Sequence, residues 1–68
     1  MTVMFSANGK SRQTEGGTTI ADLLSAAKLE PMQVFVEYNG EPLDRALFAT
    51  TVVGDGDSIE IVQMVGGG

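Results

Sequence analysis

The segment Thr19-Ile20-Ala21-Asp22-Leu23-Leu24-Ser25-Ala26-Ala27 carries the helical spacing that decides the fold of this chain. Thr19 is a favourable N-cap residue, and Asp22 three positions later gives a weaker version of the capping box. Four apolar residues recur at i, i+3, i+4 and i+7 and form one stripe along a helix: Ile20, Leu23, Leu24 and Ala27. The segment therefore predicts a helix with one apolar face.

The predicted helix runs from Ile20 to Lys28, because a lysine suits the negative end of the helix dipole. Pro31 disfavours helical backbone at the residue before it. A helix this short is marginal in water by itself. It must pack its apolar stripe against a sheet, so we expect strands on both sides of it in the sequence.

A predicted β-hairpin precedes the helix. Residues 2–7 alternate between apolar and other side chains, which is typical of a half-buried strand, with Phe5 on the buried face. Asn8-Gly9 follows, and this pair is the strongest short-range signal of a hairpin turn. The return strand, Lys10–Glu15, is polar and weakly patterned, as suits a solvated sheet edge.

The segment after the helix predicts another strand, Val34–Asn39, with Val34, Val36 and Tyr38 on one face. Asn39-Gly40 turns the chain, and we expect Pro42 to prevent immediate strand pairing there.

Residues 43–53 leave a short strand or a turn of helix open. Three residues are expected to anchor this segment against the core: Leu47, Phe48 and Val52.

The last predicted strand, Ser58–Val65, follows the polar turn Gly54-Asp55-Gly56-Asp57 and buries Ile59 and Ile61. The order hairpin, helix and further strands predicts an α+β fold of the β-grasp (ubiquitin-like) type. Its mixed sheet has four to five strands, and one main helix packs on one face. We expect residues 1–65 to form this domain and residues 66–68 to form a flexible C-terminal glycine tail.

The composition narrows the chemistry that the chain can perform. Among its 68 residues are no cysteine and no histidine, so it lacks a thiol nucleophile and the commonest general base and metal ligand. Its net charge of −5 argues against nucleic-acid binding and suits either solubility or docking onto a basic protein surface. The sequence has no signal-peptide pattern and no apolar run of membrane-spanning length, so we expect a cytoplasmic protein. We also expect the chain to be monomeric when free.

The terminal glycines, Gly66, Gly67 and Gly68, are the best functional signal in the sequence. Glycine lets a backbone approach another surface closely, and three extended residues span about 10 Å. The tail could therefore carry a free carboxylate into a partner's active site. An inert tail or a linker is the alternative interpretation.

Four apolar residues have outward parity on their predicted strands: Met4, Phe35, Val62 and Met64. If the sheet places the first and third predicted strands beside the last one, we expect these residues to form an exposed partner-binding patch. Methionine suits such surfaces because it repacks easily. Two weaker candidates are a phosphate site at Gly16-Gly17-Thr18-Thr19, which lacks the phosphate-loop spacing, and a calcium site at Asp55 and Asp57, which lacks the other ligands.

Several segments, in this order, resemble the ThiS branch of the ubiquitin-like sulfur carriers, also called ThiS/MoaD proteins. They are Thr19–Leu24, Val36–Gly40, Phe48–Thr51, Gly54–Val62 and the terminal Gly67-Gly68. Tyr38 stands where the family favours an aliphatic residue, and Leu47-Phe48 where a tryptophan is frequent. The resemblance implies a β-grasp fold and a sulfur carrier in the formation of the thiazole of thiamine.

The resemblance also implies a mechanism in which this chain is a co-substrate and not an enzyme. A ThiF-like activating enzyme would consume ATP to adenylate Gly68. A persulfide donor would convert the adenylate to a thiocarboxylate, and thiazole synthase would accept the sulfur. The chain itself would bind no cofactor and no metal. Other acceptors (molybdopterin, cysteine or tRNA thiolation) and a plain interaction module remain open as alternatives.

Overall fold

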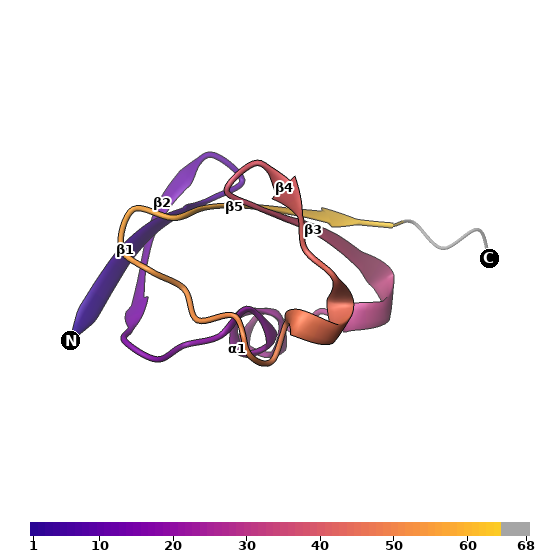
Figure 1. Ribbon diagram of the computed structural model, residues 1–68, viewed down its shortest axis with the longest axis horizontal. Helices are drawn as coiled ribbons and strands as arrows, with labels where there is room; N and C mark the ends of the chain where they lie inside the picture. The colour runs from indigo at the N-terminus through magenta and orange to yellow at the C-terminus, as the bar shows by residue number, and fades with distance from the viewer. Residues whose placement is uncertain (65–68) are drawn as a thin grey trace.

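The computed structural model describes residues 1–64, which form a five-stranded mixed sheet with one α-helix on one face (Figure 1). The helix α1 spans Ile20–Ala26. The other elements are β1 (Thr2–Ala7), β2 (Lys10–Glu15), the 3₁₀ turn η1 (Pro31–Gln33), β3 (Val34–Tyr38), β4 (Glu41–Pro42), the 3₁₀ turn η2 (Arg45–Leu47) and β5 (Ser58–Gln63). The strand order is β2-β1-β5-β3-β4, with β1 and β5 parallel and the other pairs antiparallel. The predicted α+β, β-grasp architecture is confirmed.

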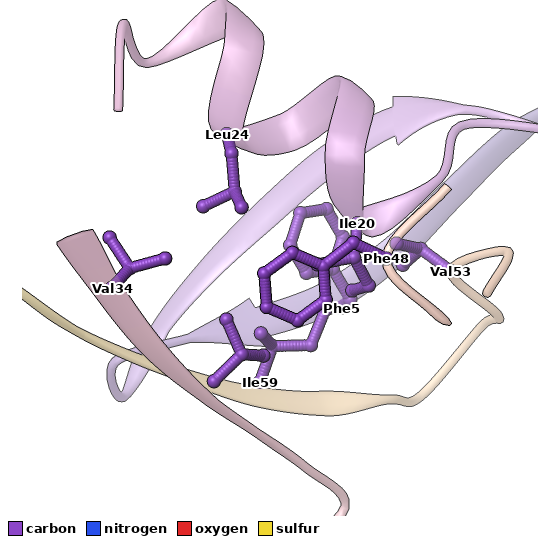
Figure 2. Close-up of a cluster of buried hydrophobic side chains, with 8 residues drawn as sticks. Phe5, Ile20, Leu24, Val34, Phe48, Val53 and Ile59 are labelled. Carbon is purple, nitrogen blue, oxygen red and sulfur yellow. The ribbon is translucent and has the colours of Figure 1, made fainter. Parts of the chain in front are cut away.

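The core lies between α1 and the sheet. Ile20 and Leu24 project from the helix toward β3 and β5, as Figure 2 shows. Ile59, at the centre of the sheet, is 0% exposed. The buried cluster consists of Phe5, Ile20, Leu24, Val34, Val36, Phe48, Val53 and Ile59. β1, β3 and β5 therefore bury the faces that their sequence alternation predicts.

The helix begins at the predicted cap. The Thr19 side chain accepts a hydrogen bond from the Asp22 backbone N–H at 3.1 Å, and Asp22 Oδ2 accepts one from the Thr19 N–H at 3.0 Å. The capping box is therefore complete, although Asp stands where Glu or Gln is usual.

The helix ends at Ala26 and not at Lys28, because Lys28 adopts a left-handed backbone with φ of 60°. The Lys28 N–H donates to the Ser25 carbonyl at 3.0 Å, and the Leu29 N–H donates to the Leu24 carbonyl at 2.8 Å. These two bonds are those of a Schellman motif, in which glycine usually holds the left-handed position.

Both Asn-Gly pairs form the predicted turns, with φ of 52° and 80° at Asn8-Gly9 and of 53° and 86° at Asn39-Gly40. The expectation for Pro42 is wrong, since Pro42 pairs with Glu37 in β4. The next residue, Leu43, donates its N–H to the Val36 carbonyl at 2.9 Å, so Pro42 occupies a position of this edge strand that needs no donor.

Residues 43–53 contain the 3₁₀ turn η2, a further turn at residues 48–50 and a short stretch with one bridge residue, Val52. Of the three expected anchors, Phe48 is buried, but Leu47 and Val52 are 49% and 50% exposed. Val53 fills the core position in place of Val52. The stretch runs beside the start of α1, because the Ile20 N–H donates to the Thr51 carbonyl at 3.0 Å and the Val53 N–H donates to the Thr18 carbonyl at 2.9 Å. In the part of the chain described here, no helix is long and apolar enough to cross a membrane.

Candidate functional site

The outer face of the sheet, opposite α1, carries the apolar side chains that the sequence singles out. β5 lies between β1 and β3, which is the arrangement on which the predicted patch depends. Val62 of β5 stands directly opposite Phe35 of β3, and these side chains are 53% and 45% exposed. Two exposed side chains on adjacent strands make a continuous apolar surface, and such surfaces mark docking sites.

Met64 extends this surface just past the end of β5. Its N–H donates to the Gln33 carbonyl at 2.8 Å, so the β3 side of the sheet still holds the chain at this residue. The Met64 side chain is 47% exposed. Phe35, Val62 and Met64 form what we call the outer patch, which lies at the end of β5 where the described chain stops.

Met4 lies apart from the outer patch, contrary to expectation. Its side chain is 47% exposed and has the expected outward parity, but its carbonyl accepts from the Gly56 N–H at 2.7 Å, ahead of β5. Gly56 precedes β5, and Val62 lies four residues beyond Ser58, the first residue of β5, which alone corresponds to about 13 Å. The sequence could not show this, because it depends on the offset between the parallel strands β1 and β5.

An acidic pair adjoins the outer patch on the same face. Glu37 of β3 stands directly opposite Glu60 of β5 in the sheet register. Two like charges placed this way repel each other and weaken strand pairing. This pair could not be inferred from the sequence, since the two residues come from strands that are distant in the chain. The pair fits a partner that presents basic groups beside an apolar surface.

The carboxylate of Asp57 holds the turn before β5 together. Asp57 accepts hydrogen bonds from the Tyr38 hydroxyl at 2.5 Å, from the Gly54 N–H at 2.6 Å and from the Asn39 amide at 3.1 Å. Burial alone would raise the pKa of Asp57, but the hydrogen bonds from Tyr38, Gly54 and Asn39 outweigh it, and the pKa lies below its ordinary value. Asp57 is therefore a structural anion that ties β3 to the start of β5.

The same contact explains why a tyrosine stands at position 38. Its ring is partly buried on the core face, and its hydroxyl reaches Asp57. Hydrogen bonding to Asp57, burial and the nearby negative charge together raise the pKa of Tyr38 above its ordinary value. An aliphatic residue would fill the core position but would leave Asp57 without this donor.

The two weaker candidate sites have structural uses. Asp55 accepts from the Met4 N–H at 2.8 Å, and Asp57 is engaged as described, so both carboxylates serve the turn and are not arranged as calcium ligands. Within residues 1–64, no three side chains of metal-binding type are grouped. Thr18 donates its hydroxyl to the Glu15 carbonyl and Thr19 caps α1, so both threonine hydroxyls at the candidate phosphate loop are already engaged.

The tail residues Gly66, Gly67 and Gly68, together with Val65, lie outside the described residues. Their role therefore stays a prediction. What the structure does place is the strand that leads to them and the outer patch beside that strand.

A five-stranded mixed sheet with one helix on one face and an exposed apolar patch at the end of its central strand places the chain in the class of ubiquitin-like β-grasp proteins. Residues 6–68 match the ThiS family, so the chain belongs to that family. The predicted family and the predicted role of a sulfur carrier protein in thiamine biosynthesis are confirmed.

Similar proteins agree with this assignment. The sulfur carrier protein ThiS of Bacillus subtilis is 41% identical over 66 residues, which cover 96% of this chain and 100% of the relative. A crystal structure of the thiamine biosynthesis protein ThiS from Geobacter metallireducens shares the fold with a TM-score of 0.78 and 39% identity, over 97% of this chain and 100% of that chain.

A thiazole synthase of Magnetococcus marinus is 36% identical over 61 residues, which are 90% of this chain. The chain spans only 19% of that relative, and the same holds for the thiazole synthase of Paramagnetospirillum magneticum.

Proposed function

We propose that this chain carries sulfur as a thiocarboxylate on Gly68 and delivers it to a thiazole synthase. The observation that carries the proposal is the family match, which extends to residue 68. The outer patch supports it, because an apolar surface at the end of β5 would hold a partner beside the tail that follows. Gly66 and Gly67 would provide a slim approach, and Gly68 would provide the reacting carbonyl.

The chemistry requires activation by a partner. A terminal carboxylate, with a pKa near 3.5, is ionised at neutral pH and is a poor electrophile. A ThiF-like enzyme would transfer AMP from ATP to the carboxylate and release pyrophosphate. The outer sulfur of a persulfide would then attack the acyl carbon and displace AMP, and a thiol would reduce the resulting acyl disulfide to the thiocarboxylate. ATP is thus consumed on the partner, in the cytoplasm, and this chain binds no cofactor.

Thiazole synthase is the acceptor that we propose. In two relatives with that name, a segment similar to this chain occupies about a fifth of a longer protein. A carrier module joined covalently to its acceptor needs no separate encounter, so the fusion supports a partnership between the two proteins.

The test is the intact mass of the chain after incubation with ATP, a ThiF-like activating enzyme and a persulfide source. The expected gain equals the exchange of one oxygen for one sulfur. Removal of Gly67 and Gly68 should abolish this gain without unfolding the domain. The carrier proposal fails if a competent activating enzyme produces neither an adenylate nor a thiocarboxylate.

The acceptor is tested with the purified thiocarboxylate. We expect thiazole formation with thiazole synthase and no turnover with the large subunit of a molybdopterin synthase. Turnover in the second assay alone would keep the carrier mechanism and exclude the thiazole assignment.

A further inference from the structure

The side chain of Asn8 acts as an extra strand residue beside β5. The backbone pairing between β1 and β5 ends with Ala7 opposite Ile59. Past that point the Asn8 N–H donates to the Ile59 carbonyl at 2.9 Å. The Asn8 side-chain amide then makes two hydrogen bonds to Ile61, two residues further along β5. Its Oδ1 accepts from the Ile61 N–H at 2.7 Å, and its Nδ2 donates to the Ile61 carbonyl at 3.1 Å.

Asn8 therefore extends the pairing between β1 and β5 beyond the last backbone pair, Ala7 and Ile59. Alternate residues of β5 direct their backbone groups to opposite sides: Ile59 and Ile61 face Asn8, and Met64 faces Gln33 of η1. Ile61 is thus the last residue of β5 at which β5 is held from the β1 side. In Figure 1, β5 continues past the end of β1 toward the end of the described chain.

We propose that Asn8 is a positioning residue, which fixes the direction in which β5 delivers the reactive tail into the partner's active site. The proposal rests on the proposed function, because the direction of β5 has no chemical consequence unless its end is activated. Without Asn8, Ile61 would lose its partners on one side. The last residues of β5 would then be held through β3 alone. The end of the strand would therefore adopt a wider range of directions relative to the outer patch.

The turn chemistry does not by itself require asparagine at position 8. A φ of 52° is also open to glycine and to aspartate, and both occur in such two-residue hairpin turns. Among these three residues, only asparagine offers a donor and an acceptor together, which the N–H and the carbonyl of Ile61 require. The amide thus has a role beyond that of the turn.

The chain contains its own matched control in Asn39. This residue also precedes a glycine, has a φ of 53° and bonds to β5. Its N–H donates to the Ser58 carbonyl at 2.7 Å, and its Oδ1 accepts from the Ser58 N–H at 2.8 Å. Its contacts lie at the start of β5 and those of Asn8 near the end, so the two positions separate loss of hydrogen bonds from loss of tail direction.

The experiment compares Asn8→Gly with Asn39→Gly in the full chain, with Asn8→Asp as an intermediate that keeps only the acceptor. Amide hydrogen exchange at Met64 reports the end of β5. Loss of two hydrogen bonds predicts on the order of tenfold faster exchange there in Asn8→Gly and little change in Asn39→Gly. The Asn8→Asp variant should fall between the unaltered chain and Asn8→Gly.

The functional readout is adenylation by the ThiF-like enzyme. In Asn8→Gly the kcat should fall by on the order of tenfold, because the carboxylate is delivered less often in a reactive geometry, while the KM for the carrier stays unchanged. Asn39→Gly, despite a similar loss of hydrogen bonds, should keep the kcat. A purely structural role of Asn8 would lower the unfolding midpoint without this division between kcat and KM.

The outcomes separate the two proposals. Unchanged exchange at Met64, or an equal kcat in the two glycine variants, would overturn the role of Asn8 and leave the carrier function standing. If the unaltered chain is not adenylated at all, the carrier function fails, and the positioning role fails with it, even where exchange still reports the contact with Ile61.

Discussion

Single side chains in this small domain often bridge segments that are distant in the sequence. The hydroxyl of Tyr38 and the carboxylate of Asp57 connect β3 to the turn before β5, and the amide of Asn8 connects the first hairpin to the end of β5. A domain of this size buries a limited apolar area, so such bonds contribute a substantial share of its stability.

The contact between Tyr38 and Asp57 predicts how stability depends on pH. The pKa of Asp57 is lowered by folding, so its contribution is present above its unfolded pKa and is lost as the pH falls through the folded value, below about pH 4. The pKa of Tyr38 is raised by folding, so its contribution is present below its unfolded pKa and is lost as the pH rises beyond about pH 10.

Tyr38→Phe should therefore cost about 1 kcal/mol at pH 7 and flatten both flanks of the stability profile. Urea unfolding from pH 2.5 to 11 measures this. Tyr38→Phe removes the hydroxyl and keeps the ring, so core packing is unchanged. A constant difference between the two proteins at every pH would show that the hydroxyl does not interact with the charged form of Asp57.

Lys28 holds a backbone conformation that favours glycine, with φ of 60°. We expect Lys28→Gly to stabilise the domain by about 1 kcal/mol, because a left-handed backbone costs a residue with a Cβ roughly that much. Ala26→Gly, which introduces glycine within the last turn of α1, should instead destabilise the domain by about 1 kcal/mol. Thermal unfolding of the two variants should shift the midpoint in opposite directions; shifts in the same direction would contradict the assignment of the Schellman motif.

At the scale of elements, β5 is the central strand of the sheet. It pairs with β1 on one side and β3 on the other, buries Ile59 and presents Val62 outward. Its outer face also places Glu60 against Glu37, an arrangement that opposes strand pairing.

Replacement of this acidic pair should stabilise the sheet. Glu60→Lys creates an opposite-charge pair with Glu37 and should add about 0.5 kcal/mol at low salt, with the gain declining as salt screens it. Glu41→Lys is the matched control, since Glu41 is exposed and pairs with Tyr38 rather than with an acid. Chemical unfolding at two salt concentrations measures the gain, and an equal gain in both variants would attribute it to net charge alone.

At the scale of the whole molecule, the sequence predicted most of the fold because its signals are local. The Asn-Gly turns, the capping box at Thr19 and the alternation of each strand depend on neighbours in the chain. The structure places all of them where they were predicted. The end of α1 was predicted two residues too late, because Lys28 takes a position that glycine usually marks.

The remaining features depend on how distant segments meet. Met4 has the predicted parity but lies apart from the outer patch, because the offset of parallel strands is not encoded locally. Val53 replaces Val52 in the core, because an irregular segment gives no period from which to infer a face. The partners of Asn8 and Asp57 are likewise tertiary, and they were visible in the sequence only as turn residues.

The outer patch gives the last prediction, which concerns the molecule as a docking unit. Val62→Asp places a charge at its centre and should weaken binding to the activating enzyme and to thiazole synthase by about tenfold or more. Removal of one well-packed interface residue commonly costs upwards of 1 kcal/mol. Val62 is 53% exposed, so the free domain should keep its unfolding midpoint.

Val52→Asp is the matched control, because Val52 is a valine of 50% exposure outside β5. Titration calorimetry should find the affinity reduced in the first variant and unchanged in the second. An equal effect of both variants would mean that net charge, and not the outer patch, governs docking. An unchanged affinity in Val62→Asp would place the interface on another face of the sheet.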